Sequence, residues 1–227
     1  MDVALATTRP DAPDHATASE PPAGIGPRLR RLRHGNPWIF STMLVSSCLS
    51  LVASFVLSVD AVRLAADPNA ALSCNINSVI SCGTVASAWQ SQLFGFPNAF
   101  LGLIAEPVVI TIAVAGLGGV VFPRWFMFSA QVVYTLGLAF AYWLFSQSMF
   151  VIGALCPWCL LVTASTTGVF ASMTHVNIRD GNLFLPRRVD AALRSVIGAD
   201  LDLVAVVIWL LLLTLAVVAK YGALLFA

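Results

Sequence analysis

Two pairs of cysteines carry the most reactive chemistry in this sequence. Cys156 and Cys159 enclose Pro157 in a Cys-Pro-Trp-Cys motif, and Cys74 and Cys82 lie upstream with seven residues between them. Free amides and the dipole at a helix N-terminus stabilise a thiolate, and proline suits the first helical turn. A Cys-x-x-Cys pair in that position can close a disulfide and reopen it. The alternatives are an inert disulfide and half of a tetrahedral zinc site completed by the other pair.

The elements that must position these thiols lie in a membrane. The chain is 59% hydrophobic and 10% charged, whereas a soluble domain carries roughly 25% charged residues. The net charge of +1 gives no general attraction to nucleic acid. Five apolar runs approach the roughly 20 residues that a spanning helix needs, and we predict an all-α integral membrane protein, a four-helix transmembrane bundle core plus a fifth transmembrane helix. The predicted spans are 38–59, 98–121, 125–145, 155–173 and 203–218.

The composition divides the chain into four parts. Residues 1–36 lack apolar periodicity and are predicted to be a disordered cytoplasmic tail; they are too long and too polar for a simple cleaved signal peptide, so an uncleaved first helix is expected. Residues 37–176 form the predicted catalytic core, with an outer loop at 60–97. Residues 177–200 are a predicted cytoplasmic basic loop, and residues 201–227 contain the fifth span.

The basic residues predict the orientation, because short cytoplasmic loops retain Lys and Arg. With a cytoplasmic N-terminus, only Arg63 and Lys220 lie outside. The other basic residues then lie inside, namely Arg9, Arg28, Arg30, Arg31, Arg33, Arg124, Arg179, Arg187, Arg188 and Arg194. All four paired cysteines face the outside, where disulfides persist. Cys48 lies within the first span, where a small apolar role is expected.

Two thiol pairs at one surface favour an electron relay over an inert disulfide. Thiol–disulfide exchange runs through mixed disulfides, so a loop pair can pass electrons to a fixed pair. The electrons must then reach an acceptor, and a helix bundle in a membrane can reach a lipid-dissolved quinone. The order of the two pairs along the chain fits such a relay.

The combined motifs resemble the vitamin K epoxide reductase family in its bacterial form. They are Cys-x7-Cys in the first outer loop, Phe-Gly-Phe-Pro-Asn at 94–98 with Gly102 four residues later, and Cys-Pro-Trp-Cys opening the fourth span. The resemblance covers about residues 38–175. It implies a four-helix core that takes electrons from a thioredoxin-like protein and passes them to a quinone.

The resemblance also implies a role for each cysteine. By position, Cys159 reacts with the quinone, Cys156 exchanges with Cys82, and Cys74 faces the partner protein. Asn98 stands where the family's asparagine donates a hydrogen bond to a quinone carbonyl.

Five further residues are candidates for quinone binding. Ser87 lies next to the position where the family commonly has a hydroxyl, which is Ala88 here, and Thr163 stands where some members have tyrosine. Glu106, inside the second span, is either a protonated carboxyl near the quinone or on a proton path, or a neutral helix contact. Trp89 and Phe94 either belong to a half-helix that covers the site or anchor the chain at the interface.

We therefore expect a membrane thiol–disulfide oxidoreductase that supports disulfide bond formation. It would reoxidise a DsbA-like, thioredoxin-fold protein, with menaquinone or ubiquinone as the electron acceptor. We expect a multi-pass protein of the bacterial inner or cell membrane, with a separate partner protein, since the chain ends at Ala227. Vitamin K epoxide reduction in vitro stays open. The alternatives are a zinc-binding membrane protein using the four cysteines, and a small transporter using Glu106 in the Pro-interrupted second helix.

Overall fold

A computed structural model of the chain describes residues 33–72, 74–75 and 79–225. Residues 1–32, most of the predicted tail, lie outside the described residues. The described part contains five helices long and apolar enough to span a membrane, which confirms the predicted fold class. They are α2 (Asn36–Ala66), α4 (Ala99–Leu117), α5 (Arg124–Gln147), α6 (Pro157–Arg179) and α8 (Leu201–Leu225).

Short helical segments connect the long ones. Between α2 and α4 lie α3 (Cys82–Ser87) and the 3₁₀ turn η1 (Trp89–Gln92). The π turn η2 (Ser148–Ile152) ends α5, and α7 (Arg187–Gly198) precedes α8. Two boundaries differ from the sequence predictions: α2 continues into the predicted outer loop, and the predicted basic loop at 177–200 contains α7. A proline N-cap at Pro186 and an amphipathic sequence explain the second difference.

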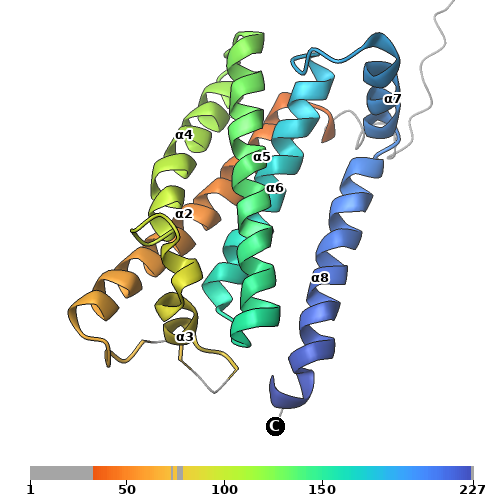
Figure 1. Cartoon of the computed structure of the whole chain (residues 1–227). Coiled ribbons are helices and arrows are strands. Elements are labelled where there is room, and N and C mark those ends of the chain that lie inside the picture. Colours follow the sequence, from red (N-terminus) through yellow and green to blue (C-terminus); the bar gives the residue numbers. More distant parts are fainter. Residues whose placement is uncertain (1–32, 73, 76–78, 226–227) are drawn as a thin grey trace, which may run out of the picture.

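Helix α2 crosses the bundle diagonally and packs against both α4 and α6, while α5 packs on α6 (Figure 1). Small residues permit the close crossings. A Cβ atom at Gly102 would lie 2.1 Å from Ser54 Oγ, and one at Gly168 would lie 2.6 Å from Ser46 Oγ. Small residues let helix backbones approach in a membrane, where dispersion contacts replace the hydrophobic drive. The α2–α4 and α2–α6 crossings thus fix the walls of the bundle.

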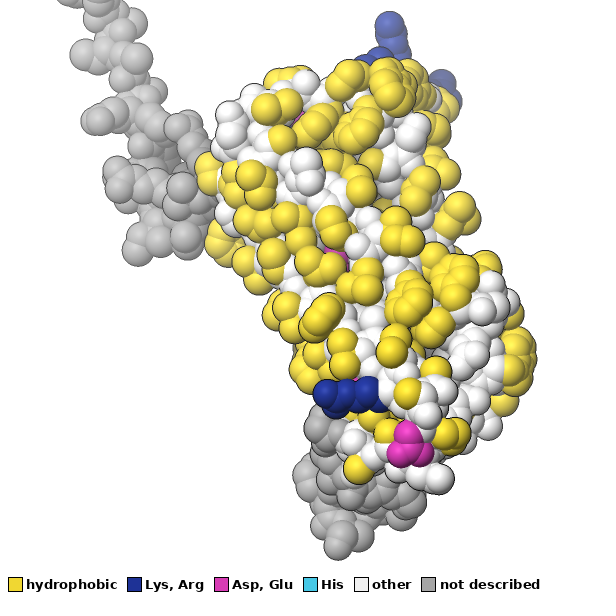
Figure 2. All heavy atoms as spheres, turned by 90° about the vertical axis from the view of Figure 1, so that its left-hand side faces the viewer, with side chains coloured by type: hydrophobic (Ala, Val, Ile, Leu, Met, Phe, Trp, Pro, Cys, Tyr) yellow, Lys and Arg dark blue, Asp and Glu magenta, His cyan; other side chains and the backbone are white. Residues whose placement is uncertain are grey.

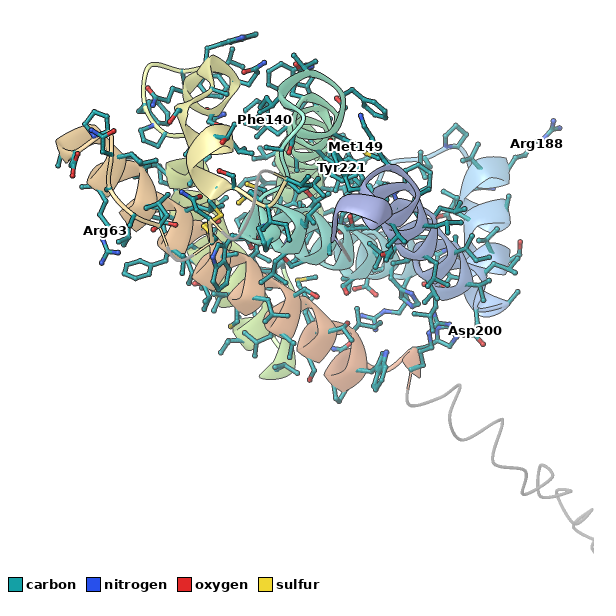
Figure 3. The ribbon with its side chains drawn as sticks, turned by 90° about the horizontal axis from the view of Figure 1, so that it is seen from below. Arg63, Phe140, Met149, Arg188, Asp200 and Tyr221 are labelled. Carbon is teal, nitrogen blue, oxygen red and sulfur yellow. A yellow bond between two sulfur atoms is a disulfide. The ribbon has the colours of Figure 1, made fainter. Side chains whose placement is uncertain are left out.

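Helix α8 stands at the side of the bundle, against α6 (Figure 1). At one end, Asp202 accepts a hydrogen bond from Arg33 (2.7 Å) and pairs with His175 Nδ1 (2.7 Å). At the other end, Tyr221 Oη donates to the Met149 carbonyl at 2.8 Å, and the two residues lie side by side in Figure 3. Polar contacts therefore hold α8 at both ends.

The surface has the character of a membrane protein. Figure 2 shows a largely hydrophobic face over α2 and α4, with Lys, Arg, Asp and Glu side chains gathered mainly toward its ends. Helix α8 has a mean hydropathy of 2.8 over its spanning window, and none of that window is buried inside the protein. Apolar side chains that face outward along such long helices require lipid around them.

Candidate active site

A short backbone pairing brings the two cysteine-bearing segments together. Leu155 N–H donates to the Val79 carbonyl (2.7 Å), and Ser81 N–H donates to the Leu155 carbonyl (3.1 Å). Gly153, at the end of η2, has a φ of 74°, a conformation that favours glycine, and turns the chain into this pairing. The segment before Cys82 is thereby fixed beside the segment before Cys156.

The sulfur atoms of Cys74, Cys82 and Cys156 lie next to one another in that order. Cys74 and Cys82 form a disulfide. The Cys156 Sγ atom lies 3.3 Å from Cys82 Sγ and accepts a hydrogen bond from the Cys159 amide at 3.4 Å. Cys156 is the N-cap of α6, so Cys159 lies in the first turn of that helix. A thiolate at Cys156 is within contact distance of the disulfide sulfur that it would attack.

The environment of Cys156 favours its thiolate. The pKa of Cys156 is lowered, mainly because the Cys159 thiol donates a hydrogen bond to its sulfur, with help from the backbone amides of Cys159 and Trp158. Burial and the charge of Asp60 act in the opposite direction. The amides at the N-terminus of α6 therefore contribute to the lowered pKa of Cys156, but less than the Cys159 thiol does.

A cavity of about 430 Å³ begins at these sulfur atoms and continues between the helices. Cys82, Cys156 and Cys159 form part of its wall. Ile104 of α4 and Val133 of α5 line it as well and are also exposed on the outer surface. Since α4 and α5 make few direct contacts, the cavity borders the lipid-facing side of the bundle. Its volume lies within the range typical of small-molecule sites.

Three predicted quinone ligands, Asn98, Glu106 and Thr163, line this cavity. Asn98 Nδ2 donates to the Gln90 carbonyl at 2.6 Å, which leaves one N–H of the amide unused. Asn98 Oδ1 and Glu106 Oε2 are buried without a hydrogen-bond partner among the described residues. Buried polar atoms are rarely left unpaired, so the wall is suited to a ligand with polar groups of its own.

The other three candidates lie outside the wall of this cavity. Ser87 lines a smaller neighbouring cavity of about 240 Å³. Trp89 and Phe94 are 66% and 54% exposed, and their rings contact Trp143 and Phe140 respectively. Of these four aromatic residues only Phe140, which Figure 3 labels, lines the main cavity. The segment predicted as a half-helix is a single 3₁₀ turn, η1, whose residues Gln90 to Gln92 form part of the cavity wall.

Sequence reasoning missed several polar residues of the wall. They are Ser50, Ser54, Tyr134, Ser148 and Thr166. A signal for the first two exists in the sequence, since α2 carries serines at 47, 50, 54 and 58, a helical spacing within an otherwise apolar span, and all four are buried. Such a stripe indicates a polar face directed into the bundle.

Comparison with known families agrees with this geometry. The family model described as Vitamin K epoxide reductase family matches residues 41–174. The chain belongs to the vitamin K epoxide reductase family. A search of curated proteins found no match. The part matched by the vitamin K epoxide reductase family includes all four paired cysteines and the helices of the four-helix core, whereas α7 and α8 follow it. Membership makes the chain a membrane oxidoreductase of a family with disulfide and quinone redox chemistry.

Proposed function

We propose that this protein oxidises the thiols of a DsbA-like, thioredoxin-fold protein and passes the electrons to a membrane quinone. The observation that supports it most is the 3.3 Å separation of Cys82 Sγ and Cys156 Sγ. This contact joins a loop disulfide to a Cys-x-x-Cys pair that lies in the wall of a lipid-facing cavity. A relay needs both the sulfur contact and the cavity.

The relay consists of balanced thiol–disulfide exchanges. A partner thiolate attacks Cys74, breaking the Cys74–Cys82 bond and forming a mixed disulfide; the partner's second thiol then releases Cys74 as its own disulfide closes. The freed Cys82 thiolate attacks Cys156 of an oxidised Cys156–Cys159 pair and releases Cys159, and Cys74 then attacks Cys82 to restore the loop disulfide. The state in the structure, with the loop pair oxidised and Cys156 and Cys159 reduced, holds the two electrons next to the cavity.

A quinone accepts two electrons and two protons when it binds at such a site. The cavity suits it, because its wall is mainly apolar and offers Asn98 and Glu106 with unpartnered oxygen atoms. Cys159 lies in that wall and re-forms the disulfide with Cys156 as the pair is oxidised. We assign the free N–H of Asn98 to one quinone carbonyl, and the Thr163 hydroxyl, which bonds the Cys159 carbonyl at 3.0 Å, to the same region.

The remaining predicted contacts form the rim of the site in this proposal. Phe94 packs on Phe140, which lines the cavity, and Trp89 packs on Trp143, which stacks on Phe140 in turn. Ser87 lines the neighbouring cavity, which shares Gln92 with the wall of the main one. Menaquinone and ubiquinone present the same two carbonyl groups, and both suit the site.

We further propose that the cysteine end of the bundle faces the outside of a bacterial cell membrane. Six of the seven described arginines belong to the opposite end, as the positive-inside rule requires of a cytoplasmic face, and only Arg63, in the last turn of α2, lies toward the cysteine end. The six are Arg33, Arg124, Arg179, Arg187, Arg188 and Arg194. Cys74 is 6% exposed, so the partner must open this segment locally before it can attack.

The proposed activity is testable with the full chain in lipid nanodiscs. A reduced thioredoxin-fold protein should be oxidised in stoichiometric amounts as ubiquinone-1 or a menaquinone analogue is reduced. Cys156→Ser should abolish the reaction, and Cys48→Ser, which alters the exposed free cysteine of α2, should leave it intact. Equal activity in the wild type and in Cys156→Ser would disprove the relay.

Zinc binding is the less favoured alternative. A site built from the four cysteines needs four thiolates, and the Cys74–Cys82 disulfide offers none from its pair. Within the described ranges, no group of three or more His, Cys, Asp and Glu side chains could hold a metal. Metal analysis of the purified protein separates the two functions.

A further inference from the structure

A carboxyl group lies in the cavity wall in the middle of helix α4. Glu106 is eight residues beyond Asn98, which places it about 12 Å farther from the cysteine end of the bundle. Its Oε1 atom accepts a hydrogen bond from Ser50 Oγ at 2.7 Å and one from Tyr134 Oη at 3.2 Å. Its Oε2 atom is buried and has no partner among the described residues.

These contacts indicate the protonation state of the Glu106 carboxyl. None of the ion pairs in the described part of the chain includes Glu106. An ionised carboxylate in the middle of a span costs several kcal/mol, so burial without a cation favours the neutral acid. Both hydroxyl donors point at Oε1, which makes Oε1 the carbonyl oxygen and leaves the proton on Oε2. The Oε2–H group is therefore a buried donor with no acceptor in the described protein.

Glu106 lies at the depth in the cavity where the far carbonyl oxygen of a quinone in contact with Cys159 would lie. The Tyr134 hydroxyl contacts Glu106 and also interacts with Thr166. Thr166 lies seven residues beyond Cys159 on α6, about 10 Å along the helix. The two carbonyl oxygens of a para-quinone are about 5 Å apart. With a contact of about 3 Å at each oxygen, the ring and its two contacts span a length similar to the distance along α6 from Cys159 to Thr166.

We propose that Glu106 is a catalytic acid that protonates the quinone oxygen farther from Cys159, with Ser50 and Tyr134 holding its carboxyl in place. This inference rests on the proposed quinone reductase function. It separates the two halves of the chemistry: the cysteines deliver electrons at one end of the cavity, and Glu106 delivers a proton at the other.

The step balances with the groups already named. Oxidation of Cys156 and Cys159 forms one S–S bond and releases two electrons and two protons. One thiol proton goes to the near quinone oxygen, and the Oε2 proton of Glu106 goes to the far oxygen. The second thiol proton leaves to the aqueous phase, from which the Glu106 carboxylate regains one proton. The sum is one dithiol and one quinone converted to one disulfide and one quinol.

The first test examines the carboxyl itself without turnover. Glu20 and Glu106 are the two glutamates of the chain. In a Glu20→Gln protein labelled with ¹³C-carboxyl glutamate, the label reports on Glu106 alone. Infrared spectra of the full chain in nanodiscs at neutral pH should show the carbonyl band of a protonated acid. A spectrum with only carboxylate bands would overturn the proposal, whatever the behaviour of any variant.

The second test separates the acid step from binding. Glu106→Gln keeps the size of the side chain and a carbonyl oxygen for Ser50 and Tyr134, but its amide is not an acid. Loss of a general acid lowers a rate by about 100-fold or more, so kcat for ubiquinone-1 should fall by that factor with little change in KM. Thiol exchange between a small dithiol and the protein cysteines, measured without quinone, should be unchanged. Thr111→Val, on the exposed side of α4, is the matched control and should match the wild type.

Two other outcomes are informative. A raised KM with unchanged kcat in Glu106→Gln means that Glu106 only binds, and it overturns the catalytic role. A wild-type protein whose reduced cysteines transfer no electrons to any quinone refutes the underlying function instead. The two failures are therefore distinguishable.

Discussion

Removal of the Asn98 side chain tests the outer end of the cavity. Asn98 Nδ2 donates to the Gln90 carbonyl at 2.6 Å, and its second N–H is the donor assigned to a quinone carbonyl. Asn98→Ala removes both donors. The variant therefore affects the 3₁₀ turn η1 and the ligand at the same time, and the two effects have to be measured separately.

The size of each effect follows from the hydrogen bonds lost. The Gln90 carbonyl loses a short bond, and leaving a buried acceptor unpaired costs about 1–3 kcal/mol of stability. A bond to the quinone contributes about 0.5–1.5 kcal/mol net, which corresponds to about a 2- to 12-fold rise in KM. Thiol exchange at Cys156 and Cys82 should be unaffected, because neither sulfur contacts the Asn98 amide.

Asn177→Ala is the matched control. Asn177 is a fully buried amide that donates to Gln131 Oε1 at 2.9 Å near the other end of the bundle. It should lower the melting temperature by a similar amount and leave KM for ubiquinone-1 at the wild-type value. If a folded Asn98→Ala protein shows the same KM as Asn177→Ala, the asparagine does not bind the quinone and its role is to hold η1.

Two further predictions concern pH and helix α8. The pKa of Cys156 is lowered, and the charge of Asp60 opposes this shift. Thiol exchange by Cys156 should therefore stay fast below the ordinary thiol pKa of about 8.5, and its rate should fall only as the pH drops through the lowered pKa of Cys156. Asp60→Asn should move that inflection in a stopped-flow pH profile to still lower pH, and a shift upward would contradict the assigned electrostatics. A chain ending at Gly198 should reduce quinone with a small dithiol but melt at a lower temperature, because it loses the Asp202 and Tyr221 contacts of α8. Loss of quinone reduction in a folded truncation would show that α8 shapes the site.

The fold was predictable because the membrane imposes a simple rule. A spanning helix must be apolar over about 20 residues, so the apolar runs along the sequence identify all five spanning helices. Their ends were less predictable. Helix α2 continues from Val59 to Ala66, past the apolar run, because polar residues such as Asp60 can extend a helix beyond the span. Helix α7 was not predicted, because a short amphipathic helix does not produce a long apolar run.

Site residues were predictable where the chemistry requires a fixed spacing along the chain. They were not predictable where the packing of distant helices brings them together. The Cys-x-x-Cys motif and its proline predict a helix start, and Cys156 is indeed the N-cap of α6. Tyr134 could not be identified in this way, because its contact with Glu106 depends on how α4 and α5 are placed relative to each other in the bundle. Such contacts between residues distant in the chain leave no local pattern.

The most direct test of the relay is disulfide mapping of Cys159→Ala under non-reducing conditions. Without Cys159, the Cys156 thiolate still lies 3.3 Å from Cys82 Sγ, so it should attack the loop disulfide, release Cys74 and remain trapped. We expect a peptide that links Cys156 to Cys82, a free Cys74, and no quinone reduction. Recovery of Cys156 linked to Cys74 instead, or continued quinone reduction, would contradict the assigned order of electron transfer.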